Sequence, residues 1–267
     1  MRKRTKLNSK NWQLPTFKIS EFFSKKNKYC ICIPVLNEGE KFKKQLEGMK
    51  KYTKLVDIII ADWGSTDGST DLKFLKSQNV RTLLVKKSFG FQATQLRMAF
   101  SYAMKQGYQG VIQIDGNGKD GLPAIPNFIK ALEGGYDYVQ GSRFIKGGKA
   151  VNTPPLRLLG VKLIAAPIIS FAARFHYTDI TNGFRAYSRY YLLHPEVKPF
   201  RDIFVRYALN FYLAVRANQL GLKTKEIPVS RRYPKGKAPT KITFLKGNYV
   251  MLSEIIKAAL GFYHPKK

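Results

Sequence analysis

The chain has 267 residues, of which 44% are hydrophobic and 13% aromatic, so it can form a large folded core and is not a disordered polypeptide. It contains 47 Lys and Arg residues against 17 Asp and Glu residues, which gives a formal net charge of +30. Such an excess indicates an anionic partner, namely nucleic acid, a phosphorylated substrate or an acidic membrane surface.

Residues 1–28 are rich in Lys and Arg and show little hydrophobic periodicity, which predicts a basic N-terminal arm. From residue 29 onward, apolar runs of strand length alternate with segments whose apolar residues recur at helical spacing. The predicted strands are Tyr29–Val35, Val56–Ala61, Val80–Val85, Gly110–Ile114 and Tyr136–Val139. This alternation predicts a Rossmann-like α/β fold with a mostly parallel sheet and helices on both of its faces.

Apolar stripes mark two of the intervening helices, and two shorter segments are also expected to be helical. The stripes are Phe42-Leu46-Met49 and Ala93-Leu96-Phe100-Ala103, and the other two helices are Asp71–Lys76 and Ala124–Leu132. Later segments are predicted as a helix within Arg201–Leu220, a strand at Glu226–Val229, a loop over 231–241 and an amphipathic helix at about Thr243–Leu260. We therefore expect a main domain over residues 29–248 and a C-terminal helix and tail over 249–267.

The most apolar segment of the chain is Leu156–Phe175, which contains three basic residues and Pro167. Its uncharged centre, Leu163–Ala173, is about half of the roughly 20 residues that a membrane-crossing helix needs. The segment is therefore predicted to be a helix that lies on a membrane surface or packs in the core, and both alternatives remain open.

The two cysteines, Cys30 and Cys32, lie two residues apart on a predicted strand and therefore on one face of it. This spacing does not suit a disulfide, and three scattered histidines do not complete a zinc site. No apolar signal segment follows the basic N-terminus. These features predict buried thiols in a reducing, cytoplasmic compartment.

Polar residues cluster directly after three of the predicted strands, at Asn37-Glu38, Asp62–Asp67 and Asp115–Asp120. Any one cluster is explained by an ordinary turn, since Gly, Asn, Asp and Ser are common turn residues. In open α/β sheets, however, ligands bind beyond the carboxyl ends of the strands. Three clusters at equivalent positions therefore predict a binding site at this edge of the sheet.

The motifs around these positions resemble those of family 2 glycosyltransferases. Ile33–Glu38, with the sequence I-P-V-L-N-E, resembles the family's opening I-P-x-Y-N-E, and Ala61–Ser69 resembles its D-D-G-S-T-D-G-T turn. Six further elements resemble those of the dolichol-phosphate mannose synthase branch and occur in the same order along the chain. They are G-S-R-F from Gly141, the pair Gly147-Gly148, Arg157, D-I-T-N-G-F-R-A-Y from Asp179, E-I-P-V from Glu226 and T-K-I from Thr240. The resemblance spans about residues 29–248.

This resemblance implies a GT-A fold and an enzyme that transfers a sugar from a nucleotide sugar to a polyprenyl (dolichyl or undecaprenyl) phosphate. The protein would act at the cytoplasmic face of a membrane, as a peripheral protein on an anionic surface. For the donor, the resemblance implies that the base and ribose contact Pro34, Leu36, Glu38 and Asp62. Arg232 and Lys241, in the loop over 231–241, would close over the donor diphosphate, and Asn117 and Lys119 are also expected to bind the nucleotide sugar.

For the acceptor, the resemblance implies that Arg143 and Arg157 hold its phosphate. A phosphate monoester is already a nucleophile at pH 7, so no dedicated general base is required. Asp179 would serve as a base for a hydroxyl acceptor, or else would orient the loop that includes Arg185. Together with Asp115, the residues Asp179, Arg143 and Arg185 form the predicted catalytic set.

The metal motif of the family, D-x-D-x-Q, is altered in this chain. Asp115 stands at its first carboxylate, Asn117 replaces the second, and Lys119 places an ammonium group where a neutral amide is usual. We therefore expect a weakened Mg²⁺ or Mn²⁺ site at Asp115 and Asn117, with Lys119 partly replacing the cation beside the diphosphate. The alternative is that Asp120 turns inward as a ligand.

Two other functions remain open. The same fold and donor would serve an enzyme that adds a sugar to a surface polysaccharide or another saccharide acceptor. The charge alone would also permit a nucleic-acid-binding protein. The basic residues are not confined to one stripe, however, and no nucleic-acid-binding motif is present, so nucleic acid is not the expected partner.

Overall fold

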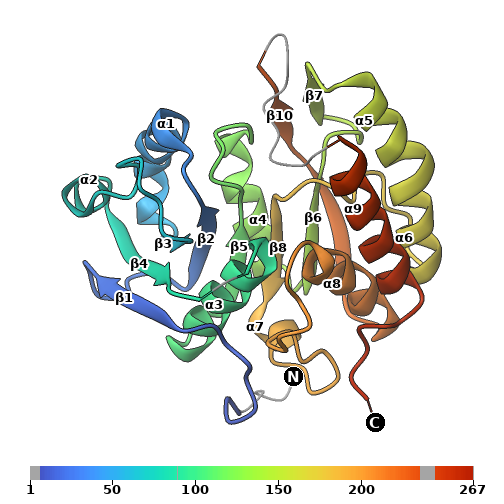
Figure 1. Ribbon diagram of the computed structural model, residues 1–267, viewed down its shortest axis with the longest axis horizontal. Helices are drawn as coiled ribbons and strands as arrows, with labels where there is room; N and C mark the ends of the chain where they lie inside the picture. Colours follow the sequence, from blue (N-terminus) through green and yellow to red (C-terminus); the bar gives the residue numbers. More distant parts are fainter. Residues whose placement is uncertain (1–6, 89, 235–243, 267) are drawn as a thin grey trace.

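The computed structural model describes residues 7–88, 90–234 and 244–266. An eight-stranded sheet runs through the molecule in the order β1-β4-β3-β2-β5-β8-β6-β9 (Figure 1). Its strands are β1 (Phe17–Glu21), β2 (Tyr29–Val35), β3 (Asp57–Asp62), β4 (Val80–Lys86), β5 (Gly110–Gln113), β6 (Tyr138–Ser142), β8 (Arg185–Ser188) and β9 (Thr224–Pro228). Strands β4, β3, β2 and β5 are parallel, as are β6 and β9. The predicted mostly parallel α/β sheet is confirmed.

Two strands of this sheet were not predicted. β1 lies within the basic segment 1–28 and pairs antiparallel with β4. β8 lies between β5 and β6 and is antiparallel to both. β1 has the sequence F-K-I-S-E, which alternates apolar and polar residues over a short stretch only and is only partly buried, and the sequence of β8 resembles a loop motif. Hydrogen bonding to neighbouring strands, rather than local pattern, makes both segments extended.

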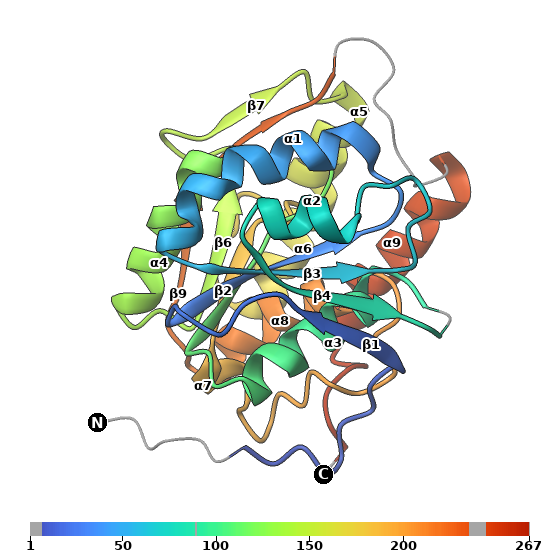
Figure 2. The ribbon, with the colours of Figure 1, turned by 90° about the vertical axis from the view of Figure 1, so that its left-hand side faces the viewer.

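Helices cover both faces of the sheet, as predicted. The helices on one face are α1 (Gly39–Met49), α2 (Leu72–Ser77) and α4 (Ile125–Glu133), of which α1 and α2 lie in front of the strands in Figure 2. Those on the other face are α3 (Gln92–Lys105), α6 (Ala166–Ala173), α8 (Ala208–Gln219) and α9 (Phe244–Ala259). Two 3₁₀ turns, Lys50–Lys54 and Leu122–Ala124, and the short helix α7 (Arg189–Leu192) complete this part of the chain.

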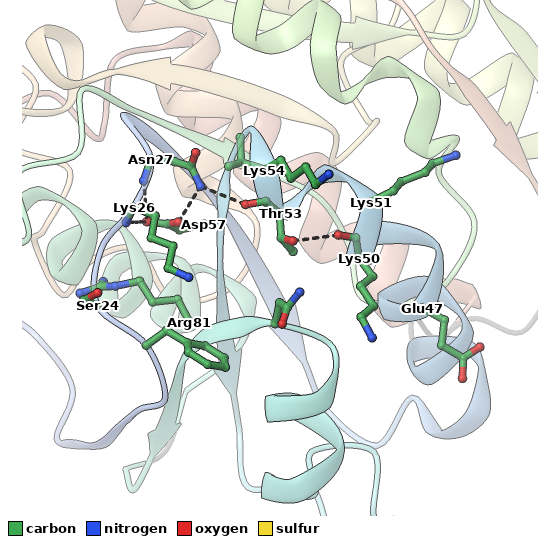
Figure 3. A pocket seen from close by; sticks show the side chains of 13 residues that line it. Ser24, Lys26, Asn27, Glu47, Lys50, Lys51, Thr53, Lys54, Asp57 and Arg81 are labelled. Carbon is green, nitrogen blue, oxygen red and sulfur yellow. Dashed lines mark hydrogen bonds between the residues drawn. The ribbon is translucent and has the colours of Figure 1, made fainter.

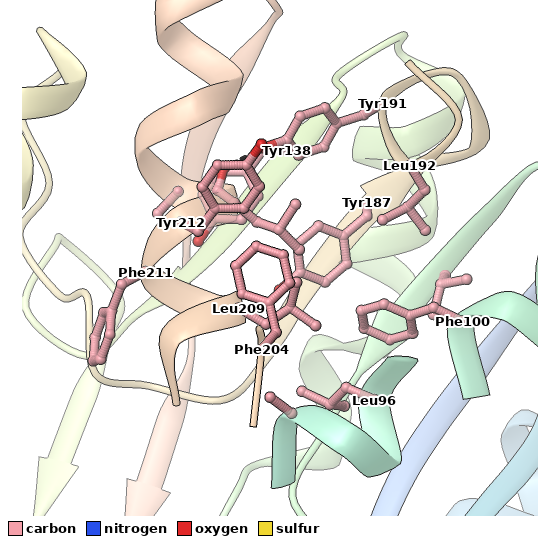
Figure 4. Close-up of a cluster of buried hydrophobic side chains, with 14 of the residues drawn as sticks. Leu96, Phe100, Tyr138, Tyr187, Tyr191, Leu192, Phe204, Leu209, Phe211 and Tyr212 are labelled. Carbon is pink, nitrogen blue, oxygen red and sulfur yellow. Dashed lines mark hydrogen bonds between the residues drawn. The ribbon is translucent and has the colours of Figure 1, made fainter. Parts of the chain in front are cut away.

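The core is divided by the sheet because successive side chains of a strand point to opposite faces. In β2, Ile31 and Ile33 pack with α1 and α4, whereas Cys30 and Cys32 pack with α3. Both cysteines are buried as free thiols on the same strand face, which confirms that part of the prediction. The larger cluster is rich in aromatic side chains drawn from α3, β6, β8 and α8 (Figure 4).

The helix predicted within Arg201–Leu220 begins later, at Ala208. Just before its start, the backbone N–H of Tyr207 donates to Oε2 of Glu254 on α9 at 2.9 Å. A carboxylate near a helix N-terminus stabilises the unpaired N–H groups there. A residue distant in the sequence therefore fixes the start of this helix.

The apolar segment forms one continuous helical rod that consists of α5 (Pro155–Gly160), a π-turn (Val161–Ala165) and α6. Its inner side packs on α8 and α9, while Leu163 and Phe171 on its outer side are 69% and 90% exposed. Over the described residues, Pro155–Ala173 is the one helix that meets the length and hydropathy of a membrane span, by composition alone. The rod is thus both a packing element and an exposed apolar surface.

A small parallel ribbon, β7 (Lys149–Val151) and β10 (Ser230–Arg232), lies beside α5 in both ribbon views (Figures 1 and 2). It brings residues that follow β9 close to the loop that follows β5, since Asp120 and Arg231 form a β-bridge.

Candidate active site

The loops that follow β2 and β3 are bonded to each other at the carboxyl edge of the sheet. The backbone N–H of Asn37 donates to Ser65 Oγ at 3.0 Å, and the Asn37 Oδ1 accepts from the N–H of Thr66 at 2.8 Å. The N–H of Gly39 donates to the carboxylate of Asp67 at 2.7 Å. Two of the three predicted polar clusters therefore form one continuous surface, with half-buried Glu38 at its margin.

Asp62, the last residue of β3, is buried and shapes this surface. Its carboxylate accepts from both the N–H and the hydroxyl of Ser65, the latter at 2.6 Å, and from Thr70 Oγ1 at 3.4 Å. Burial raises the pKa of Asp62 in spite of these bonds. Beside it, the ring of Trp63 lies 4.4 Å from Lys86 Nζ. The indole thus faces a cation here.

The third cluster joins the same edge through close contacts with β2 and α1. A methyl group at Gly116 would lie 3.0 Å from the carbonyl oxygen of Pro34, so the loop passes directly against the end of β2. Gln45 on α1 fixes the loop twice, by donating to the carbonyl of Asp115 at 2.9 Å and accepting from the N–H of Gly118 at 2.8 Å. Pro34 and the half-buried Leu36 therefore lie at the same carboxyl edge of the sheet as Asp62 and Asp115.

The carboxylate of Asp115 is partly exposed and accepts from three side chains. Oδ1 accepts from Gln92 Nε2 at 3.2 Å, and Oδ2 accepts from Arg231 Nη2 at 3.2 Å and from Asn117 Nδ2 at 3.5 Å. Gly183 leaves the space for this carboxylate, because a Cβ there would lie 2.5 Å from Oδ1. The position of Asp115 is therefore fixed from several elements at once.

Arg231 links this carboxylate to that of Asp120, which accepts from Arg231 Nη1 at 2.6 Å. Next to the pair, Lys119 Nζ lies 5.1 Å from the ring of Tyr233, and Arg157 Nη1 donates to the Tyr233 hydroxyl at 3.0 Å. Burial, followed by the charge of Arg231, lowers the pKa of Lys119. Burial alone would raise the pKa of Tyr233, but the guanidinium groups of Arg231 and Arg157 hold it below its usual value. We call these five residues (Asp115, Lys119, Asp120, Arg157 and Arg231) the charged cluster.

Two neighbouring arginines of β10 (Ser230–Arg232) face opposite ways. Arg231 points into the charged cluster, whereas Arg232, which was predicted to bind the diphosphate, is exposed on the other side of β10. Strand alternation accounts for the difference, because neighbouring side chains of a strand face opposite ways. In the sequence, Arg231 is marked only as the first of two adjacent basic residues that follow E-I-P-V. Lys241 lies outside the described residues.

Arg143 and Asp179 form a buried ion pair. Arg143 Nε and Nη2 donate to the two Asp179 oxygens at 2.6 and 2.9 Å, and Nη2 also donates to Thr181 Oγ1 at 3.1 Å. The side chains are 2% and 0% exposed. Glu226 supports the same loop by accepting from the N–H groups of Thr178 and Asp179. This geometry favours the orienting role of Asp179 over the role of a general base.

Arg185, which was predicted to belong to the catalytic set, is enclosed by backbone carbonyl groups. Its side chain is fully buried, and its guanidinium donates to the backbone carbonyls of Asn182, Asn210 and Ile180 at 2.9, 2.6 and 2.6 Å. A group enclosed in this way does not touch a substrate. Arg185 instead holds the 180–182 loop against α8.

A cavity of about 880 Å³ lies at the opposite edge of the sheet, where β3 begins (Figure 3). Lysine side chains surround it, and Asp57 beside it accepts from Asn27 Nδ2 at 2.8 Å and from the Tyr108 hydroxyl at 2.6 Å. None of the predicted site residues lines it. The candidate active site is therefore the loop edge beyond β2, β3 and β5.

The sequence model of the family described as Glycosyl transferase family 2 matches residues 30–194, which is more than half of the chain. Among curated proteins, the polyprenol monophosphomannose synthase of Mycolicibacterium smegmatis is 26% identical over 204 residues, covering 75% of this chain and 76% of that protein. The undecaprenyl-phosphate mannosyltransferase of Micrococcus luteus is 24% identical over 201 residues, covering 74% and 81% respectively.

Among solved structures, a similar one is glucosyl-3-phosphoglycerate synthase from Mycobacterium tuberculosis in complex with Mn²⁺, UDP and glucosyl-3-phosphoglycerate. The TM-score is 0.63 at 17% identity, with 87% of this chain and 78% of that chain covered. A second complex of the same enzyme, with Mn²⁺, UDP and phosphoglyceric acid, gives a TM-score of 0.64 at 16% identity, with 90% and 80% covered. At this identity the likeness establishes the GT-A fold alone.

Proposed function

The chain belongs to glycosyl transferase family 2, and from this premise we propose that it transfers a sugar from a nucleotide sugar to a polyprenyl phosphate at a membrane surface. The donor lies across the edge formed by Pro34, Leu36, Glu38 and Asp62. An oxygen of the acceptor phosphate attacks the anomeric carbon, and the bond from that carbon to the nucleoside diphosphate breaks. The charge that develops on the leaving diphosphate is stabilised by fixed cations of the charged cluster.

The observation that carries this proposal is the position of Arg157. Its guanidinium belongs to the charged cluster and contacts Tyr233 beside it, while its own helix, α5, exposes Leu156 and Leu159 to solvent by 62% and 53%. A polyprenyl phosphate has a charged head and an apolar chain. One helical rod therefore offers a cation for the phosphate and an apolar surface for the lipid. Arg143 is held by Asp179, so we assign the acceptor phosphate to Arg157 first.

We expect Arg157→Ala to lower kcat/KM for the lipid phosphate by about 10- to 100-fold. This factor corresponds to the free energy of the hydrogen bonds that a charged group contributes. The binding of the nucleotide, measured separately by calorimetry, should change much less. Arg216→Gln is the matched control, because Arg216 lies on α8 outside the charged cluster and pairs with the exposed Glu196 at 3.1 Å. An unchanged kcat/KM in Arg157→Ala would contradict the assignment.

The rod and α9 also support association with the cytoplasmic face of a membrane. α6 packs against α9, and exposed apolar side chains continue from one to the other. They are Leu156, Leu159, Leu163, Ile164, Phe171, Tyr249, Ile256 and Leu260. The net charge of +30 favours an anionic leaflet, where each nearby Lys or Arg contributes about 1 kcal/mol. We infer a peripheral protein that docks through this surface.

Phe171→Asp should reduce the binding of the protein to anionic lipid vesicles by about 10-fold or more, since burial of a large apolar side chain contributes about 1.5–3 kcal/mol. Co-sedimentation with vesicles measures the change. Leu72→Asp is the matched control, because Leu72 is 52% exposed on α2, on the other face of the sheet. Equal losses in the two variants would argue against docking through α6.

The overall function is tested by incubating the purified chain with labelled sugar nucleotides and vesicles that contain polyprenyl phosphate. The label should move into the organic phase as an acid-labile lipid product. Label that moves only into a water-soluble or insoluble saccharide would favour the glycan-acceptor alternative.

A further inference from the structure

The charged cluster contains a cation of its own at the place where enzymes with an intact D-x-D motif use a metal ion. We propose that Arg231, assisted by Lys119, neutralises the donor diphosphate in place of a divalent metal. This inference rests on the proposed function, because it concerns the same donor site. It predicts that the enzyme binds its nucleoside diphosphate equally well with and without metal.

The oxygen donors around Asp115 do not fit a divalent cation. Mg²⁺ takes near-octahedral oxygen coordination, at phosphate sites with one or two protein carboxylates beside phosphate oxygens and water, and Mn²⁺ favours similar ligands. Within the described parts of the chain, no group of three His, Cys, Asp or Glu side chains is placed to hold a metal. Asn117 turns its amide nitrogen toward Asp115, at 3.5 Å, and its oxygen accepts from the N–H of Lys119 at 3.3 Å. Both oxygens of Asp115 already accept hydrogen bonds.

Asp120, the alternative ligand in the sequence analysis, is not free to turn inward. It is 7% exposed, its Oδ2 is bound by Arg231 at 2.6 Å, and its backbone forms a bridge with the same residue. Its Oδ1 is buried without a hydrogen-bond partner in the part of the chain that the structure describes. One such oxygen, next to a guanidinium, does not make a coordination shell. Asp120 therefore serves to hold Arg231.

The net charge of the charged cluster favours the binding of an anion over the binding of a metal cation. Three cationic side chains, Arg231, Lys119 and Arg157, lie around the two carboxylates, so the cluster has a net positive charge. A guanidinium has a planar set of donors that binds two phosphate oxygens at once. The bond from Arg231 Nη2 to the partly exposed Asp115 is the longer of its two ion pairs. It is the one that a diphosphate oxygen would replace, while Asp120 keeps the guanidinium in place.

The test is titration calorimetry of GDP and UDP with the full chain, once in excess EDTA and once in Mn²⁺. For the nucleotide that binds, the dissociation constant should differ by less than about threefold between the two conditions. The kcat should likewise be similar in EDTA and in Mn²⁺. Arg231→Gln should weaken binding in EDTA by about 10- to 100-fold, and Arg231→Lys by less. Lys149→Gln is the matched control, because it removes an exposed positive charge from the adjoining strand β7.

A reciprocal variant tests the same idea in the other direction. Asn117→Asp combined with Lys119→Gln and Arg231→Gln restores the D-x-D-x-Q pattern and removes both built-in cations. This variant should bind Mn²⁺, seen as a loss of the free-ion signal in electron paramagnetic resonance, and its nucleotide binding should now require the metal. Failure of the variant to gain Mn²⁺ would count against a metal-replacing role for these two cations.

The outcomes separate this inference from the function on which it rests. Binding of a nucleotide by the unaltered protein in Mn²⁺ but not in EDTA overturns the inference and leaves the glycosyltransferase function standing. Binding of no nucleoside diphosphate under either condition overturns both. The comparison uses the unaltered protein, so it does not depend on whether a variant folds.

Discussion

Arg143→Ala is expected to lower the free energy of unfolding by about 3–5 kcal/mol, the effect of removing one partner from a buried ion pair. Asp179, which is 0% exposed, would lose the guanidinium that compensates its carboxylate. The variant would also lose the bond from Arg143 to Thr181 and leave the 178–182 loop less well fixed. Urea denaturation, followed by circular dichroism, measures the loss.

A double-mutant cycle with Asp179→Ala distinguishes this cause from a simple loss of packing. The double variant should be less destabilised than the sum of the two single variants, because the uncompensated charge is then absent. Arg216→Ala provides a reference at an ion pair with one exposed partner. Glu196 is 66% exposed, so water screens the charge that the variant leaves behind, and the loss should be smaller than that at Arg143. Additive effects at Arg143 and Asp179 would show that the pair is not energetically coupled.

Gly183→Ala should lower kcat/KM by about 100-fold or more while leaving the fold intact. The added Cβ would lie 2.5 Å from Asp115 Oδ1 and 2.9 Å from its Cγ, so the carboxylate must move. Its bonds to Gln92 and Arg231 would then be lost or lengthened. A displacement of about 1 Å in a catalytic site can cost about 100-fold in rate. The main effect is expected on nucleotide binding and turnover, measured by steady-state kinetics and calorimetry.

Gly160→Ala is the matched control for this prediction. A Cβ at Gly160 meets nothing within 4 Å, and the residue lies in a helical segment, where alanine is favoured over glycine. This variant should be as stable as the parent or slightly more stable, with normal turnover. If Gly183→Ala retained full activity at normal stability, the position of Asp115 would not matter to the reaction.

Much of the donor edge was predictable from the amino-acid sequence because it depends on local patterns. The apolar run Tyr29–Val35 has the same bounds as β2, and Asp62 ends β3 within one residue of the predicted strand end. Parallel strands joined by helices bring their carboxyl ends to one edge of a sheet. The order of strands and turns therefore determined that the clusters after β2, β3 and β5 would lie together.

The side chains that act at this edge were decided by tertiary contacts. Which of Arg231 and Arg232 faces the site depends on how β10 pairs with β7, and Arg185 and Arg143 differ from surface arginines only by what encloses them. Strand β1 and the start of α8 likewise depend on partners distant in the sequence. An arginine has the same chemistry in every sequence, but burial and register decide whether it binds a carbonyl, a carboxylate or a phosphate. Those two properties arise only when distant segments pack together.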